Sequence, residues 1–414
     1  MPRLCHVRSE RWQDRALRRI WTVALGWAVA VAACSLPNVG LWQGGGHANI
    51  GLFELYGRHV AAGGIPYRPG FSFEYPPGAI PPLAVPALPP GSYVVWFHVF
   101  ELACLLAAVA AVAALRPARY AVLATAAAPA LLGQLTLSSF DLWPAALAAT
   151  AVLLVVRGHP RAGAGFLAAS TAAKLYPILL APVLYASVSR TQGRAEARRS
   201  LALGTVVTAA FFLPFAILGP GGLRFSLEEQ VTRGLQVESL GGSLFGIAHR
   251  LGAPVHVVIS TSPFSYDIGG DWARAAAALT TIILLAAVAA VVRAFCAGPI
   301  DVERTLDAVA ATAVAFVAFG KVLSAQYLLF LIPLVPLVRR VRPVVLLGVA
   351  LALTQVWARF PQPFGQVIGL HGMIWVTFAR NVVLVGLFAD LLAQLVRTRQ
   401  PVESAASRSL VSSS

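Results

Sequence analysis

Apolar stretches of about 20 residues recur along most of the chain, and short polar segments separate them. A stretch of this length can cross a bilayer as an α-helix. The pattern therefore predicts an all-α, polytopic transmembrane helical bundle with about twelve spans. Spans are expected at residues 20–36, 93–115, 120–133, 140–156, 200–218, 273–295, 304–320, 322–338, 342–358 and 375–396, with two further short helices between residues 162 and 188.

The stretch 162–188 differs from the others because arginines flank both of its ends. Arginine-rich loops mark the cytoplasmic side of a membrane protein, so both ends of this stretch belong on the same side. Two short helices that meet near residues 174–177 (KLYP) satisfy this requirement, because Pro177 disfavours one continuous helix. Broken helices are tolerated in membranes where they line a cavity.

The arginines also orient the whole chain. Six of them lie within residues 1–19, which we interpret as a cytoplasmic basic tail, and the multi-span domain follows over residues 20–396. Two long segments with few basic residues, 38–92 and 220–271, are then outer loops. Residues 397–414 are Ser-rich and predict a disordered cytoplasmic tail. We expect a multi-pass protein of the plasma membrane with both termini in the cytoplasm.

Composition excludes a soluble globular protein, since 58% of residues are hydrophobic and only 12% are charged. The net charge of +15 does not indicate nucleic-acid binding, because the arginines fall in short loops between spans. The four cysteines lack metal-ligand or disulfide spacing, and we assign them to packing. The sequence predicts neither a bound metal nor a cofactor.

Only two lysines occur, Lys174 and Lys321, and both lie within or between apolar stretches. A charged side chain at membrane depth is costly and usually faces a partner or a wet cavity. The two lysines therefore indicate an anionic ligand. A structural pair between Lys174 and Asp141, and a Lys321 side chain that extends to the outer interface, are the alternative interpretations.

The topology brings other polar residues to the same outer face. We expect Glu54 and Glu74 in the first outer loop, Asp141 at the outer end of a span, and Arg233 and Glu238 in the second outer loop. Ion pairs with a purely structural role would be scattered over both sides of the membrane. The shared location on one face therefore indicates a functional site.

The first outer loop contains apolar residues at helical spacing between residues 50 and 60, which predicts a short amphipathic helix on the outer interface. Asn49 falls at its N-cap position. Glu74 directly precedes the next apolar run, where a carboxylate could act as a general base. Pairing of Glu74 with Arg68 or Arg58 is the alternative.

Five short motifs follow one another along the chain. They are an aromatic-rich helix that precedes residues 74–77 (EYPP), then residues 140–144 (FDLWP), 174–177 (KLYP), 233–239 (RGLQVES) and 321–327 (KVLSAQY). In this order they resemble glycosyltransferase family 87. These are GT-C-type membrane enzymes that include polyprenol-phosphate-mannose-dependent mannosyltransferases of actinobacteria. The resemblance extends over about residues 20–396.

The resemblance implies transfer of a sugar, mannose in the first instance, from a polyprenyl-phosphate donor. The acceptor would be a hydroxyl of a lipid or glycan at the outer leaflet of the cell envelope, and a single displacement would invert the anomeric centre. Positive charge would stabilise the departing phosphate. Membrane lipids are the other expected partners, and nucleic acid is not one. The donor phosphate would contact Lys174, Arg233, Gln326 and Lys321, and substrate would contact Tyr75, Glu238 and Tyr327.

The chain departs from the family at residues 47–50 (HANI), where an aspartate is expected as catalytic base and Asn49 stands instead. Three explanations are open: another carboxylate is the base, the motif is displaced along the chain, or transferase activity has been lost. The catalytic candidates are therefore Asn49, Glu54, Glu74 and Asp141. A relative that binds lipid-linked sugar without turnover is one alternative function. A lipid or sugar transporter is the other, against which stand the lack of an internal repeat and the one-sided polar groups.

Overall fold

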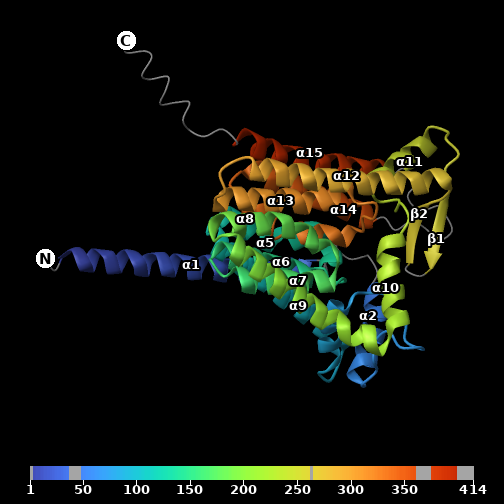
Figure 1. Ribbon diagram of the computed structural model, residues 1–414, viewed down its shortest axis with the longest axis horizontal. Helices are drawn as coiled ribbons and strands as arrows, with labels where there is room; N and C mark the ends of the chain where they lie inside the picture. The colour runs from blue at the N-terminus through green and yellow to red at the C-terminus, as the bar shows by residue number, and fades with distance from the viewer. Residues whose placement is uncertain (1–2, 37–47, 262–263, 360–373, 399–414) are drawn as a thin grey trace, which may run out of the picture.

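The computed structural model describes residues 3–36, 48–261, 264–359 and 374–398, and its long helices lie side by side in one bundle (Figure 1). The helices of this bundle are α1 (Arg3–Ser35), α4 (Tyr93–Leu115), α5 (Arg119–Leu132), α6 (Leu142–Val156), α7 (Pro160–Ala173), α8 (Ala181–Thr191), α9 (Arg194–Leu218), α12 (Asp271–Cys296), α13 (Val302–Phe319), α14 (Val341–Arg359) and α15 (Ile374–Arg397). The predicted all-α class is confirmed, apart from one small hairpin described below.

Four helices of the described residues, α4, α9, α12 and α15, are long and apolar enough to cross a membrane. The other apolar helices of the bundle are shorter. Helices of this length and composition indicate a membrane protein.

The predicted break in the stretch 162–188 is confirmed. Helix α7 ends at Ala173, a 3₁₀ segment η6 (Tyr176–Leu180) follows, and α8 begins at Ala181. Lys174 has an extended backbone with φ −147° and ψ 134°, so it terminates α7. Pro177 lies in this 3₁₀ segment, where its missing amide hydrogen disfavours a continuous α-helix.

The stretch 322–338 does not form the continuous α-helix that was predicted. This stretch forms two 3₁₀ segments, η7 (Ala325–Leu331) and η8 (Val335–Leu337), and every residue of both is buried except Gln326. Pro333 and Pro336 lack the amide hydrogens that a continuous α-helix needs there. Burial among the neighbouring helices accounts for the apolar composition of this stretch.

The interior of the bundle is centred on α13, of which most residues are buried. Alanine and valine dominate it, including Ala310, Val314 and Ala318. Helix α9 lies at the periphery: none of the residues in its most apolar stretch is buried. Such a helix, apolar and exposed, is suited to lipid contact.

The two ends of the bundle have different chemistry. At one end, arginines pair with the carboxylates of neighbouring helices, as Arg116 does with Glu303 and Arg340 does with Asp390 at 2.7 Å. The described ends of α1 and α15 nearest the two termini also point toward this side (Figure 1). The opposite end carries the two long segments that connect α1 to α4 and α9 to α12.

Both long segments are folded. The first contains α2 (Ala48–Ala61), η3 (Pro77–Ala79), α3 (Ile80–Ala84) and η4 (Val85–Ala87), and the second contains α10 (Pro220–Thr232), α11 (Leu240–Arg250), β1 (Val257–Thr261) and β2 (Phe264–Ile268). The strands pair antiparallel with Val257 opposite Ile268. The predicted helix over residues 50–60 is confirmed. Its apolar face packs into an aromatic cluster, where Phe53 and Tyr56 are buried. One face of this helix therefore contacts the rest of the protein.

Candidate functional site

A buried ion pair lies where the chain breaks after α7. The Nζ of Lys174 is 3.1 Å from both carboxylate oxygens of Asp141, which directly precedes α6. The Asp141 side chain is fully buried and that of Lys174 is 10% exposed. Tyr176 donates its hydroxyl to the same carboxylate at 3.3 Å. Asp141 occupies the N-cap position of α6 but makes no capping hydrogen bond, because its carboxylate is directed to Lys174.

Aromatic rings surround the ammonium of Lys174. Its Nζ lies 4.7 Å from the ring centroid of Phe140, 5.3 Å from that of Tyr327 and 5.8 Å from that of Tyr75. Ring faces within about 6 Å attract a cation, so the rings stabilise the charge as the carboxylate does. The predicted residues Tyr75, Asp141, Lys174 and Tyr327 therefore meet at one point, although they come from four separate segments.

The segment that carries Glu74 and Tyr75 is held against this point. Gly78 lies so close to α7 that an added Cβ would be 2.4 Å from the backbone of Ala172, and its carbonyl accepts a hydrogen bond from the Trp143 indole at 3.1 Å. Only glycine fits such an approach. The Tyr67 hydroxyl donates to the Tyr75 carbonyl at 2.6 Å. These contacts fix Glu74 beside the cluster.

Helix α10 fixes the same segment from the other side. Ser226 and Gln230 donate to the backbone carbonyl of Glu74 at 3.1 and 3.2 Å. The first turn of α10 packs on Tyr67, where a Cβ on Gly222 would lie 2.2 Å from the Tyr67 carbonyl oxygen. Arg233 directly follows the last residue of α10, so this helix sets the position of Arg233 relative to Glu74.

The Glu74 side chain is half-buried. Burial raises its pKa above the usual value, the nearby Tyr75 hydroxyl and the charges of Arg233 and Lys174 lower it, and Glu229 raises it. The net effect is a raised pKa, so burial outweighs the two cations. A carboxylate with a raised pKa beside two cations is a competent proton acceptor.

A second cationic group lies next to Arg233. The Nζ of Lys321 donates to the carbonyl of Val231 at 2.6 Å, and the Lys321 carbonyl accepts from the Gln236 amide at 3.0 Å. Burial lowers the pKa of Lys321, Asp267 raises it and Arg233 lowers it further. Lys321 is therefore held by the second long segment, and Arg233 is close enough to influence both it and Glu74.

Comparison with known proteins bears on this arrangement. The model of one family, glycosyltransferase family 87, matches residues 73–324, more than half of the chain. The chain belongs to glycosyltransferase family 87. No curated protein matches it.

The family 87 match begins one residue before Glu74 and ends three residues after Lys321. It therefore includes Asp141, Lys174 and Arg233. The candidates outside the matched region are Asn49, Glu54, Gln326 and Tyr327.

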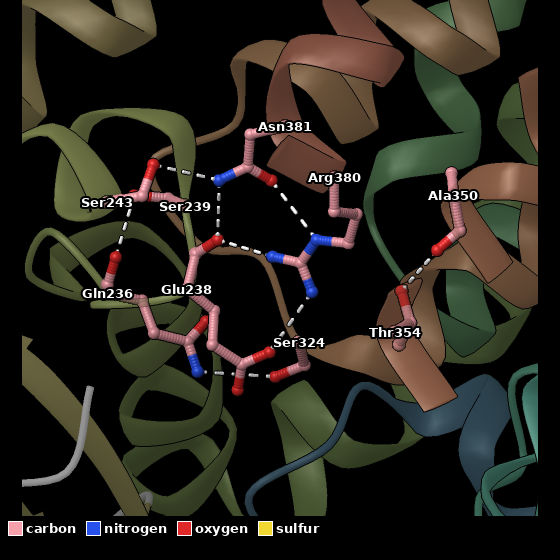
Figure 2. Close-up of polar contacts among 9 residues, drawn as sticks. All are labelled: Gln236, Glu238, Ser239, Ser243, Ser324, Ala350, Thr354, Arg380 and Asn381. Atoms are coloured by element: carbon pink, nitrogen blue, oxygen red, sulfur yellow. Dashed lines mark hydrogen bonds and ion pairs between the residues drawn. The ribbon is translucent and has the colours of Figure 1, made fainter. Parts of the chain in front are cut away.

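Glu238 takes part in a buried network of this family 87 chain (Figure 2). Its carboxylate lies 3.5 Å from Nη1 of Arg380 on α15, and its carbonyl accepts from Arg380 at 2.6 Å and from Asn381 at 3.1 Å. Asn381 also donates to the Ser243 hydroxyl at 3.0 Å. Burial raises the pKa of Glu238 and Arg380 offsets part of this rise, so the resulting pKa is about 7. The network anchors the second long segment to α15, and Glu238 points into protein.

Arg380 and Asn381 are absent from the sequence-based candidates. Both are buried, and Arg380 is the largest of the fully buried side chains. The available signal was the adjacent pair Arg-Asn inside an otherwise apolar stretch, which is as costly at membrane depth as a lysine.

The remaining candidates lie apart from the cluster or outside the description. Asn49 is in the first turn of α2, which begins at Ala48, two residues earlier than an N-cap at Asn49 requires; its side chain lies outside the described residues. Glu54 pairs with Arg58 at 2.7 Å. Arg68 donates to the carbonyl of Leu218 at 3.3 Å, so neither arginine pairs with Glu74 and that alternative is wrong. Gln326 is half-buried at the start of η7.

The arrangement offers one half-buried carboxylate, a buried lysine–aspartate pair and two further cations. Among the described residues, no group of three His, Cys, Asp or Glu side chains could hold a metal ion. The positive groups are suited to bind phosphate, lysine as a point charge and arginine as a fork of donors.

Proposed function

We propose that this protein transfers a sugar, mannose in the first instance, from a polyprenyl-phosphate donor to a hydroxyl of a lipid or glycan acceptor. The proposed setting is the outer leaflet of the plasma membrane, in a GT-C-like bundle of about twelve membrane segments with both termini in the cytoplasm. Membership of glycosyltransferase family 87 supports the reaction class. The small number of arginines in the two long segments, compared with the short connections, supports the orientation.

One observation carries the proposal. Glu74 lies where the charges of both Lys174 and Arg233 influence it, and Lys321 lies near Arg233. A base and a set of cations thus share one end of the bundle. This is the pairing that a transfer from a phosphate leaving group requires.

The proposed step is a single displacement. Glu74 accepts the proton of the acceptor hydroxyl, and the oxygen forms a bond to the anomeric carbon. The bond between this carbon and the phosphate oxygen breaks, and its electron pair leaves with the polyprenyl phosphate. Lys174 and Arg233 stabilise the charge on the departing phosphate, and Lys321 adds to the positive field. Attack opposite the leaving group inverts the configuration.

The other carboxylates are less suited to the role of base. Asp141 is fully buried and already bound by Lys174 and Tyr176, so it positions the lysine. Glu54 pairs with Arg58 on the exposed side of α2. Asn49 is an amide and cannot accept a proton at working pH.

The test is sugar transfer by purified protein in lipid vesicles, supplied with radiolabelled polyprenyl-phosphate mannose and a mixed acceptor extract. Glu54→Ala, Glu74→Ala and Asp141→Ala are assayed in parallel. We expect transfer by the unchanged protein and its loss in Glu74→Ala, with Glu54→Ala retaining activity. Absence of transfer with donor binding intact would overturn the proposal in favour of a binding protein.

A further inference from the structure

A further buried carboxyl group lies inside the bundle, on α4. Glu101 is fully buried, and its neighbours on the same face of α4 are Phe97, Cys104 and Leu105, which are buried too. The backbone amide of Leu142 at the start of α6 acts on the carboxyl group, but neither carboxyl oxygen makes a well-formed hydrogen bond within the described residues. Neither the proposed reaction nor the ion pairs described above involve this glutamate.

Aromatic packing holds this turn of α4 against the start of α6. The ring centroid of Phe100, the residue before Glu101, lies 5.7 Å from that of Trp143. Trp143 follows Asp141 by two residues. The charges of Asp141 and Lys174 both act on Glu101. Glu101 and Asp141 are therefore neighbouring carboxyl groups in one apolar interior.

The two carboxyl groups differ in charge because their partners differ. Lys174 lies 3.1 Å from the carboxylate of Asp141, and Tyr176 donates a hydrogen bond to it, so Asp141 is ionised. Glu101 has no such partner, and a buried carboxylate without a counter-charge takes up a proton instead of remaining ionised. A neutral carboxylic acid in an apolar site can donate a hydrogen bond. Glu101 is therefore a hydrogen-bond donor beside the carboxylate of Asp141.

Binding of phosphate at Lys174 creates a need for such a donor. When the ammonium of Lys174 turns to the phosphate of the donor lipid, it gives up its close contact with Asp141. A buried charge that loses its partner is strongly unfavourable. Tyr176 supplies one hydrogen bond to Asp141, whereas a carboxylate can accept about four. A second donor beside Asp141 lowers the free energy required to move Lys174 to the phosphate.

We propose that Glu101 is a positioning residue that holds a proton for Asp141. Before the donor binds, Lys174 pairs with Asp141 and the Glu101 carboxyl group is neutral. After Lys174 turns to the phosphate, Glu101 donates its O–H to the Asp141 carboxylate, so that the two groups share one proton. No proton enters or leaves the interior in this exchange. The inference rests on the proposed function, because it requires a phosphate at Lys174.

The first test is infrared spectroscopy of full-length protein in lipid nanodiscs, with polyprenyl phosphate as the added ligand and the corresponding polyprenol as control. A protonated carboxyl group has a carbonyl stretching band that is separate from the bands of carboxylates. The band that is present in the unchanged protein and missing in Glu101→Gln belongs to Glu101. We expect this band before any ligand is added, and a shift to lower frequency with polyprenyl phosphate but not with polyprenol. Lack of the band, or a band that phosphate binding leaves unchanged, would overturn the inference.

The second test is a double-mutant cycle on the affinity for the same polyprenyl phosphate. Glu101→Gln keeps a neutral hydrogen-bond donor and should bind nearly as well as the unchanged protein. Glu101→Leu removes the donor and should bind roughly tenfold more weakly or worse, with the affinity for polyprenol unchanged. In an Asp141→Asn background no carboxylate needs the donor, so Glu101→Leu should cause no further loss.

Two results of this cycle would contradict the role of Glu101. Losses in Glu101→Leu and Asp141→Asn that simply add would show that the two carboxyl groups act independently. A fall in the unfolding free energy of Glu101→Leu with unchanged affinity for polyprenyl phosphate would assign Glu101 to packing alone.

Neither test requires sugar transfer, so the two proposals fail separately. A band shift in a protein that transfers no sugar supports the role of Glu101 and contradicts the proposed reaction. Sugar transfer without a band shift overturns only the role of Glu101. Polyprenyl phosphate that binds no more tightly than polyprenol overturns both the phosphate role of Lys174 and the role of Glu101.

Discussion

Removal of the cation from the Lys174–Asp141 pair separates a structural role of Lys174 from a role in phosphate binding. Lys174→Met would leave the Asp141 carboxylate fully buried without its counter-charge. Loss of one partner from a buried pair costs about 3–5 kcal/mol of unfolding free energy. Lys174→Met combined with Asp141→Asn removes both charges and keeps an amide that Tyr176 can still contact. We expect the double variant to recover most of the lost stability.

The assay measures unfolding free energy in nanodiscs and the rate of sugar transfer for Lys174→Met, for Asp141→Asn and for the double variant. Arg58→Met serves as control, because its pair with Glu54 is exposed and contributes only about 0.3–0.5 kcal/mol. If Lys174 holds the donor phosphate, the stable double variant should still transfer at least roughly tenfold more slowly. Recovery of transfer together with stability would refute the phosphate role. No recovery of stability would refute the assignment of a buried pair.

Further predictions concern the proposed base Glu74, the network of Glu238 and Arg380, the close approach at Gly78, and Asn49. Because burial raises the pKa of Glu74, transfer should increase with pH through a value above that of an ordinary glutamate, and Glu74→Gln should abolish this limb of the pH–rate profile. Glu238 has a folded-state pKa of about 7 against the usual 4.5, so unfolding free energy should fall as pH rises between these values, and Glu238→Gln should remove the dependence in pH-dependent denaturation curves. Arg380→Met should destabilise the protein by about 3–5 kcal/mol at pH 8 and less at pH 5, where Glu238 is protonated; an equal loss at both would contradict the pairing. Gly78→Ala should lower stability by about 1–3 kcal/mol and slow transfer, because the new Cβ meets the backbone of α7; unchanged kinetics would show that Glu74 does not depend on this contact. Asn49→Asp should not raise turnover if Glu74 is the base, and an increase in the transfer assay would return that role to the first turn of α2.

The sequence was sufficient where one strong local pattern decided the structure. The predicted span 93–115 coincides with α4, because a long apolar stretch with His98 and Glu101 as its only strongly polar residues ends directly before Arg116. The break after Ala173 was also predictable, since arginines at both ends and a proline in the middle act together. Asp141 as a partner of Lys174 was among the alternatives, because each charge needed a neighbour at the same depth.

Prediction failed where tertiary packing decides. Residues 322–338 have the composition of a span, but buried 3₁₀ segments form around Pro333 and Pro336. The β-hairpin was missed because its strands are only five residues each and carry mixed side chains. Arg380 was missed because its partner Glu238 lies 142 residues earlier, and no local pattern links them.

The most direct measurement is the single-turnover rate of sugar transfer by Glu74→Gln and by unchanged protein in the same vesicles, with donor affinity measured separately. Loss of a general base lowers a rate by about 10²–10⁴-fold. We predict a loss in this range while the affinity for polyprenyl-phosphate mannose changes by less than about tenfold. Transfer at the unchanged rate in Glu74→Gln would contradict it.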